Sequence, residues 1–373
     1  MKGMVGLAIV LAACSSSSGA VTTDELQPTT TIRPTTTAVT TTTIFVATTA
    51  APEFKLEDFP SFPQTTLPPP VAASLQAVLD AAVEQGTTPG VTAAVVVADS
   101  GSWSGAAGVA ADGKSLTPES RLLTASAGKT ITAAQILRLV DEGKLELDDL
   151  AIQHFPSEIA FFDANGATVR NLLGMRSGIS DPLGYISLVD SGSTAAELLE
   201  RIGDPPFPPG SQISYANINY VLLGLIIEHV TGGSLWDALE AGVLDRHGLD
   251  GLVYQEQGAL AADGWRIEAD SASLARWGYE LYGGNVLSDA SLGQMTDFQG
   301  QWYGLGAIDF SEGTPAISGD GMPAIGHGGL EPSNAVMLVA FPQTGVVVAV
   351  QARAGSVQRA AGLAGELRAA AGP

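Results

Sequence analysis

The stretch LLTASAGKTITAAQIL, residues 122–137, holds a hydroxyl and an amine at a spacing that suits nucleophilic catalysis. Ser126 and Lys129 are three residues apart, so on a helix their side chains share one face. A serine attacks a carbonyl only when a neighbour takes its proton, and a desolvated lysine with a lowered pKa can be that base. The simpler alternative is that Ser126 caps a helix and Lys129 is a solvated charge.

The same stretch contains Gly-Lys-Thr, which also ends the phosphate-binding loop of many nucleotide-binding proteins. That loop needs a glycine five residues before Gly128, because its backbone amides must wrap the phosphates closely. Leu123 stands at this position. The phosphate-binding interpretation therefore fails, and Ser-x-x-Lys remains.

Two polar groups that could assist lie before a strongly apolar helix, in Tyr215-Ala216-Asn217. A buried tyrosine near a cationic lysine can have a lowered hydroxyl pKa and can then shuttle protons. Asn217 could offer its amide to the substrate and to the lysine together. A turn before a helix also favours asparagine for structural reasons alone.

A third candidate lies late in the chain, where His327-Gly328-Gly329 leads into a strand. Glycines there would let a substrate pair with the strand edge. The backbone amide of Leu330 could join that of Ser126 as an oxyanion hole. The alternative is a turn histidine in a simple loop.

The surrounding elements predict an α+β fold. Apolar spacing predicts helices, and alternation or apolar runs predict strands, with turn signals at Asp99-Ser100-Gly101 and Gln343-Thr344-Gly345. Strands near both termini with helices between them predict one antiparallel sheet flanked by N- and C-terminal helices, plus a helical subdomain. The chemistry is expected between sheet and helical part. Helices are expected over 71–86, 129–143, 168–175, 194–202, 219–232, 271–284 and 356–371, and strands over 91–98, 102–110, 334–342 and 345–353.

The N-terminal segment predicts export. Lys2 is followed by the short apolar run GMVGLAIVLAAC, in which small residues precede Cys14. This is a signal peptide over 1–14 that resembles the lipobox of bacterial lipoproteins, whose cysteine is lipidated. Residues 15–70 are Thr/Pro-rich and predict a disordered tether, followed by one folded domain over 71–373. We expect a lipid-anchored protein on the extracytoplasmic face of the bacterial cell membrane.

Charge and residue usage limit the partners. The chain has 17 Lys and Arg against 39 Asp and Glu, for a net charge of −22. Such a surface repels phosphate backbones, so nucleic acid is not expected as a partner. The four histidines do not cluster as ligands, so neither a metal nor another cofactor is expected. The expected partners are a small-molecule or peptide substrate and, through Cys14, the membrane; oligomeric state is left open.

Taken in order, Ser-x-x-Lys, Tyr-x-Asn about ninety residues later and His-x-Gly before a late strand resemble the serine β-lactamase family of class C type. Penicillin-binding proteins of the D-alanyl-D-alanine carboxypeptidase type and related esterases are its relatives. The stretches LVDEGKLELDDL, VRNLLGMRSGI, PFPPGSQISYANINYVLLG and WYGLGAIDF are similar too. The chain has no Gly-x-Ser-x-Gly elbow, which argues against an α/β-hydrolase.

The resemblance implies a serine hydrolase that acts on an ester, an amide or a D-peptide. Ser126 would form an acyl-enzyme, Lys129 and Tyr215 would move protons, and Asn217 would hold the substrate or the lysine. His327 would tune Tyr215, and the edge formed by Gly328, Gly329 and Leu330 would bind the substrate.

Departures from the family pattern shape the expected subtype. His327 replaces the lysine of class C β-lactamases, and Gly328 lacks the threonine hydroxyl that grips a substrate carboxylate. The histidine favours a peptidase or an esterase, while the missing hydroxyl weakens both the carboxypeptidase and the β-lactamase interpretations. A carboxypeptidase-like or esterase activity is ranked above efficient β-lactam hydrolysis. The unusual Ala127-Gly128 motivates a second hypothesis, a non-catalytic module of the same fold that binds cell-wall peptide or a protein.

Overall fold

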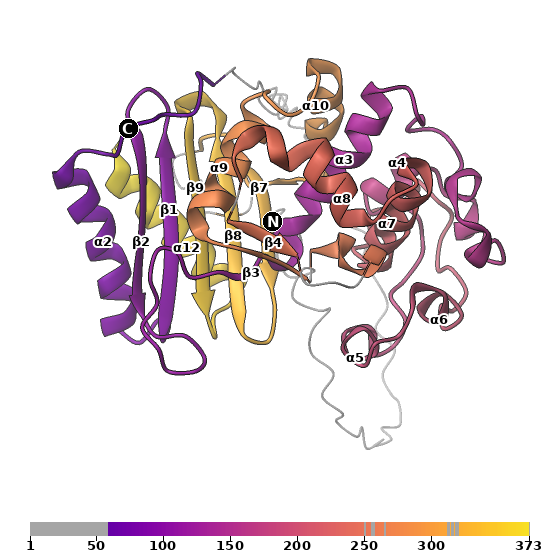
Figure 1. Cartoon of the computed structure of the whole chain (residues 1–373), viewed down its shortest axis with the longest axis horizontal. Coiled ribbons are helices and arrows are strands. Elements are labelled where there is room, and N and C mark those ends of the chain that lie inside the picture. The colour runs from indigo at the N-terminus through magenta and orange to yellow at the C-terminus, as the bar shows by residue number, and fades with distance from the viewer. Residues whose placement is uncertain are drawn as a thin grey trace, which may run out of the picture. The chain divides into compact units, whose positions relative to one another are not determined.

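The computed structural model describes residues 59–249, 251–254, 258–264, 266–311, 314, 317 and 321–372. It has helices packed on an antiparallel sheet, which is the α+β class expected from the sequence (Figure 1). The predicted signal, Cys14 and the tether up to residue 58 lie outside the described residues.

The main sheet joins the two ends of the folded chain. Its order is β2-β1-β9-β8-β7-β6, and all neighbouring strands run antiparallel. The first hairpin meets the last along β1 and β9, where Val91 pairs with Ala352 and Val97 with Val346. The strands are β1 Gly90–Val97, β2 Gly101–Gly108, β6 Ile308–Asp309, β7 Ile325–Leu330, β8 Asn334–Phe341 and β9 Val346–Arg353.

Helices cover both faces of this sheet (Figure 1). Helices α2 (Pro69–Glu84) and α12 (Val357–Ala371) pack together on one face, and α9 (Ser271–Tyr282) lies on the other. A buried polar chain fastens α9 to the sheet, because the Ser271 hydroxyl is 2.8 Å from that of Thr92 and donates to Gln351 Oε1 at 3.0 Å. With both faces covered, β8 is buried along its whole length, which explains its unbroken apolar sequence.

The helical subdomain lies between the two halves of the sheet in the sequence. A small second sheet, which was not predicted, has the order β3-β5-β4. No single described helix is long and apolar enough to cross a membrane, and α7 with residues 235–244 meets that test only as a pair bent by 78°. The elements are α3 Lys129–Asp141, α4 Val169–Leu173, α5 Tyr185–Asp190, α6 Ala195–Leu199, α7 Ile218–Thr231, α8 Leu235–Leu239, α10 Asp289–Thr296, β3 Leu122–Leu123, β4 Leu252–Tyr254 and β5 Ile267–Ala269.

The predicted end of the tether at residue 70 is wrong for its last part. Phe59 and Leu67 are buried in the core. The Phe59 ring packs 4.8 Å from that of Tyr279, centroid to centroid, and the Leu67 N–H donates to the Ser102 carbonyl at 2.9 Å. The Thr/Pro-rich composition of residues 59–70 is typical of a tether, although the few apolar residues among them anchor the segment to the core.

Candidate active site

Ser126 lies in a tight turn that runs straight into a helix. The 3₁₀ segment η2 (Ala125–Gly128) is followed without a break by α3. Ala125 has a φ of 48°, in the left-handed region that non-glycine residues rarely adopt. The turn sets the Ser126 hydroxyl 3.2 Å from Lys129 Nζ, so the two share one face as the spacing predicts.

Lys129 is fully buried, so the alternative of a solvated surface charge is wrong. Its Nζ donates to three oxygens: Ser126 Oγ at 3.2 Å, Asn217 Oδ1 at 2.8 Å and the Asp263 carbonyl at 2.8 Å. An ammonium has three donors and no acceptor, and all three find partners here. The amine is therefore held at one point beside the serine.

Tyr215 joins the pair from the segment before α7. Lys129 Nζ lies 5.2 Å from the centre of its ring. The Tyr215 hydroxyl is buried and has no hydrogen-bond partner of good geometry in the described part of the chain. Burial raises the pKa of Tyr215, while the Lys129 charge and the nearby Ser126 hydroxyl act in the opposite direction without forming a hydrogen bond of good geometry. The predicted lowering of this pKa is wrong, because desolvation of the phenolate outweighs the attraction of the lysine.

Asn217 is oriented by a carboxylate that sequence reasoning missed. Its Nδ2 donates to Asp181 Oδ2 at 3.0 Å, and the Ile218 N–H donates to Asp181 Oδ1 at 2.8 Å. With its nitrogen held there, the amide turns its oxygen to Lys129. Burial raises the pKa of Asp181, and the bonds from Ile218 and Asn217 oppose that rise. Asp181 stands two residues after the RSGI stretch that carried part of the resemblance, which is the one signal that could have found it.

Asp263 was also missed, and its contribution comes from the backbone. Its carbonyl accepts from Lys129, while its carboxylate accepts from the Tyr185 hydroxyl at 2.8 Å. The segment that contains Asp263 can approach Lys129 because Gly128 and Gly264 are in close contact: a Cβ on Gly128 would stand 2.7 Å from Gly264 Cα. The glycine beside the nucleophile therefore has a packing reason.

His327 lies within β7, so the alternative of a turn histidine in a simple loop is wrong. Its Nδ1 is 2.6 Å from the Gly328 carbonyl, which can only accept, so Nδ1 carries the proton. Nε2 then accepts from the Tyr303 hydroxyl at 3.2 Å. Burial and the Lys129 charge lower the pKa of His327 to about 3. The imidazole is neutral at physiological pH, and its ring centre is 6.3 Å from that of Tyr215.

The end of β7 presents a free edge beside Ser126. The Glu331 N–H donates to the Asn334 carbonyl, so the backbone of Leu330, one residue earlier, points away from β8. A Cβ on Gly329 would stand 2.8 Å from the Ser126 nitrogen, which explains why this residue is a glycine.

Gly328 points the opposite way. A Cβ there would meet Val357 of α12 at 3.0 Å and Met337 at 3.3 Å. The structure thus brings Ser126, Lys129, Tyr215, Asn217, His327, Gly329 and Leu330 together, with Gly328 packed toward α12.

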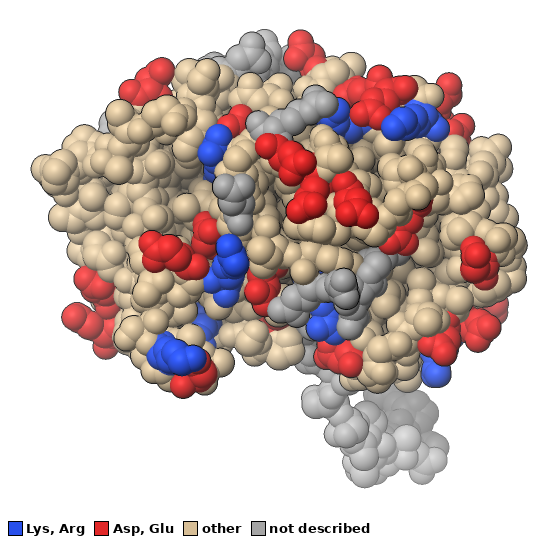
Figure 2. All heavy atoms as spheres, in the orientation of Figure 1, with Lys and Arg blue, Asp and Glu red and all other residues tan. Residues whose placement is uncertain are grey.

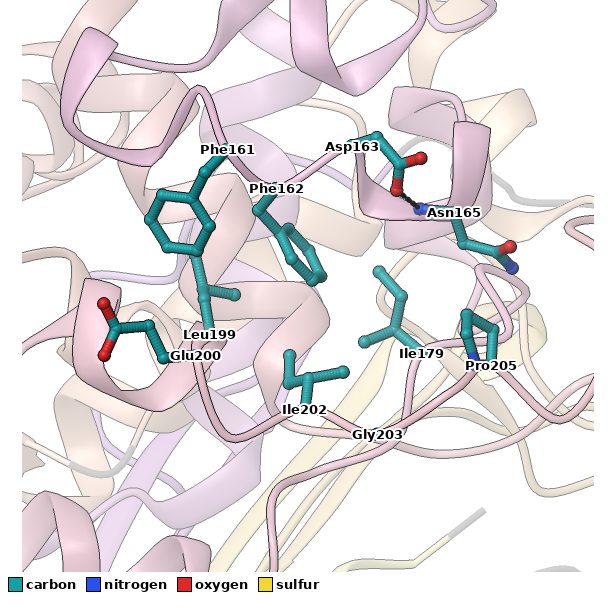
Figure 3. A pocket seen from close by; sticks show the side chains of 10 residues that line it. All are labelled: Phe161, Phe162, Asp163, Asn165, Ile179, Leu199, Glu200, Ile202, Gly203 and Pro205. Atoms are coloured by element: carbon teal, nitrogen blue, oxygen red, sulfur yellow. Dashed lines mark hydrogen bonds between the residues drawn. The ribbon is translucent and has the colours of Figure 1, made fainter.

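A separate hollow lies in the helical subdomain (Figure 3). Its volume is about 310 Å³. The Phe161 and Phe162 rings and the Ile179, Leu199 and Ile202 side chains give it an apolar wall. None of the residues around Lys129 lines it.

The surface has the acidic character that the composition predicts. Figure 2 shows Asp and Glu side chains spread over the face drawn, with Lys and Arg interspersed. In the part of the chain that the structure describes, no group of three or more His, Cys, Asp or Glu side chains is placed to hold a metal ion.

The chain is similar in sequence to known proteins. Penicillin-binding protein 4 of Amycolatopsis lactamdurans is 28% identical over 290 residues, covering 65% of this chain and 74% of the relative. Protein flp of Staphylococcus aureus is 34% identical over 120 residues, which is 31% of this chain and only 24% of the relative. The chain thus spans about a quarter of the length of these flp relatives.

Solved structures show the same fold. The D-stereospecific amidohydrolase from Streptomyces sp. has a TM-score of 0.62 at 24% identity, covering 78% of this chain and 97% of that chain. The D-amino acid amidase of Ochrobactrum anthropi SV3 in complex with D-phenylalanine has a TM-score of 0.65 at 20% identity, covering 80% and 98%. The profile of the family described as Beta-lactamase matches residues 75–371. The chain therefore belongs to the Beta-lactamase family of hydrolases.

Proposed function

We propose that the protein is a serine hydrolase that cleaves an ester, amide or D-peptide through an acyl-enzyme on Ser126. One observation carries the proposal: the fully buried Lys129 amine lies 3.2 Å from the Ser126 hydroxyl and is fixed there by Asn217 and Asp263. A side chain that only caps a helix would need no buried amine beside it.

The groups divide the proton transfers between them. Lys129, when it has released its proton, is the base within reach of Ser126. Tyr215 has a raised pKa and a buried hydroxyl without a hydrogen bond, so it is better suited to give a proton to the leaving group than to act as the resting base. The amides of Ser126 and Leu330 would stabilise the oxyanion, and water would release the acyl group.

The neutral His327 affects which substrates the proposed hydrolase would accept. A cation at this point of the strand would attract a substrate carboxylate, but the imidazole is uncharged at physiological pH. Esters, amides and peptides without a grip on a terminal carboxylate are therefore favoured over β-lactams. The D-amino acid amidase with the same fold supports an amide of a D-amino acid as one substrate class.

The binding-module alternative loses its motive. It rested on the unusual Ala127-Gly128, but Gly128 makes room for Gly264, which follows the residue whose carbonyl holds Lys129. Because Gly128 has no side chain, the two backbones can approach and the Asp263 carbonyl can reach Lys129. The departure from the family pattern at Gly128 therefore gives no reason to expect a loss of activity.

Labelling tests the proposal directly. Wild type and Ser126→Ala would be incubated with a fluorophosphonate and with a fluorescent penicillin, and intact mass would be followed over time. An adduct on wild type alone that forms and then decays is expected. Equal labelling of the two proteins would remove Ser126 as the nucleophile, and no adduct from any acyl donor would favour the binding module.

We also propose that Cys14 carries a lipid and that residues 15–58 tether the domain to the outer face of the cell membrane. The support is the signal-like sequence before Cys14. Metabolic labelling with an alkyne fatty acid should mark the wild type, and Cys14→Ser should lose the label and appear in the medium. A labelled variant would refute the assignment.

A further inference from the structure

The residue after β7 is an acid with one buried side-chain oxygen that has no hydrogen-bond partner among the described residues. This residue, Glu331, is 6% exposed, and its Oε1 accepts no hydrogen bond from any part of the chain that the structure describes. Desolvating a carboxylate oxygen without a donor is costly, and such groups are rare in folded proteins. An unsatisfied carboxyl group at the edge of an active site is therefore a candidate for ligand recognition.

Strand alternation places Glu331 on the side of Ser126. The ladder continues past β7, because the Glu331 N–H donates to the Asn334 carbonyl. Glu331 therefore shares a face with Gly329 and His327. The Gly329 Cα on this face abuts the Ser126 nitrogen. The edge thus has a His327 end and a Glu331 end, with the nucleophile between them.

The charges around Glu331 are mainly negative. They come from three elements: Asp263 of the 3₁₀ segment before Gly264, Arg266 and Glu268 at β5, and Asp190 at the end of α5. Arg266, the cation among these charges, donates to Asp190 at 3.2 Å. Burial and the three carboxylates raise the pKa of Glu331 to about 8. Negative charge therefore predominates around Glu331, which favours a cationic ligand.

The position of the proton donor sets the direction of the substrate. Attack forms a bond between Ser126 Oγ and the carbonyl carbon while the Ser126 hydroxyl proton passes to the unprotonated Lys129 amine. The bond to the leaving group breaks as that group takes a proton from Tyr215, which regains one from Lys129. Tyr215 lies at the His327 end, with ring centres 6.3 Å apart. The leaving group therefore departs there, and the acyl part retained on Ser126 points to Glu331.

We propose that Glu331 binds the ammonium group of an aminoacyl substrate, so that the enzyme prefers esters and amides of amino acids with a free amino group. This inference rests on the acyl-enzyme function proposed above. Glu331 gives up its proton when the ammonium binds, because the ammonium supplies the donors that Oε1 lacks and offsets the repulsion from the surrounding carboxylates, which also attract it.

Matched thioesters test the preference. The values of kcat/KM for D-alanine and N-acetyl-D-alanine thioesters would be measured at pH 7.5 for wild type, Glu331→Gln and Glu119→Gln. Glu119 is exposed, so its variant removes one negative charge elsewhere. We expect wild type and Glu119→Gln to favour the free amine at least tenfold, and Glu331→Gln to bring the ratio near one.

Labelling of Ser126 by the fluorophosphonate, followed in the same samples, separates the two proposals. A wild type that labels but shows a ratio near one overturns the role of Glu331 and leaves the hydrolase intact. Wild type that neither labels nor turns over either thioester overturns the hydrolase itself. A preference that survives unchanged in a folded, labelled Glu331→Gln also overturns the inference. Should this variant fail to fold, the wild-type ratio decides.

Discussion

At the scale of single residues, the two ends of the β7 edge carry buried groups that respond to pH in opposite directions. His327 is neutral because its pKa is lowered to about 3, while Glu331 keeps its proton because its pKa is raised to about 8. Both groups resist the charge that they would carry in water at neutral pH or mild acidity. Each therefore makes folding depend on pH with its own sign.

For His327 the native pKa lies below the unfolded value of about 6.5. Its contribution to stability is fully present above about pH 6.5 and is lost as pH falls toward 3. Between pH 6.5 and 4.5 the wild type should lose about 2 kcal/mol more free energy of unfolding than His327→Gln. Urea unfolding of both proteins at the two pH values measures this difference. Equal losses would contradict the buried neutral imidazole.

For Glu331 the sign is reversed, because the native pKa lies above the unfolded value of about 4.3. Its contribution is fully present below about pH 4.3 and is lost as pH rises through 8, where Asp263, Asp190 and Glu268 oppose the new charge and Arg266 favours it. Between pH 5.5 and 7.5 the free energy of unfolding of the wild type should fall by about 2 kcal/mol more than that of Glu331→Gln. Urea unfolding of both proteins across this pH range measures the difference. If the free energy of unfolding depends on pH in the same way for the two proteins, the raised pKa is contradicted.

Sequence alone located the groups that act through side-chain type and spacing. Ser126, Lys129, Tyr215, Asn217 and His327 all stand in short motifs, and the structure brings them together. The sequence did not locate groups that act through the backbone or whose properties depend on burial. The Asp263 carbonyl has no side-chain signature, and the direction of the Tyr215 pKa depends on desolvation that only the packed structure determines.

At the scale of elements, a glycine pair sets the distance between η2 and the segment that ends at Asp263. A Cβ on Gly128 would stand 2.7 Å from Gly264 Cα and 2.9 Å from Thr124 Oγ1, and one on Gly264 would stand 2.1 Å from the Ala125 carbonyl oxygen. The two backbones therefore touch at the start of α3. At Gly128, helix propensity favours alanine, whereas packing leaves no room for a side chain.

Packing should prevail at Gly128. We expect Gly128→Ala to lower the free energy of unfolding by about 1 to 3 kcal/mol, as overpacked cores do, and to slow acylation of Ser126 by moving Lys129. Gly362→Ala in α12 is the matched control, because nothing lies within 4 Å of its added Cβ. That variant should gain about 0.5 to 1 kcal/mol. Thermal unfolding and fluorophosphonate labelling rates measure both, and a stabilised, fully active Gly128→Ala would contradict the contact.

The long elements were predictable because their apolar patterns are long. Helix α3 and strands β1, β8 and β9 match the expected ranges to within a few residues. Strand β7 is not among the expected strands, because its His-Gly-Gly sequence has little strand propensity, yet pairing with β8 forms it. The two-residue strand β3 is below the length at which a pattern is readable.

At the scale of the whole molecule, a short N-terminal segment links the two faces of the sheet. Phe59 packs on Tyr279 of α9, on one face, and α2 begins at Pro69 on the other. Between them Thr66 pairs with Ser102 of β2, the last strand of the sheet. The segment therefore passes around the β2 edge and occupies part of its free hydrogen-bonding groups, which protects an edge that could otherwise pair with another chain.

This role predicts that the folded unit needs residues 59–68, although their composition resembles a tether. Phe59→Ala should lower the free energy of unfolding by about 3 kcal/mol, because it empties a buried aromatic site. Phe161→Ala is the matched control, since that ring is 57% exposed, and should change stability by less than about 0.5 kcal/mol. Denaturant unfolding compares the two. A chain that starts at residue 69 should lose at least as much stability as Phe59→Ala and should self-associate through the uncovered β2 edge; full stability of that shortened chain would show that the segment is only a tether.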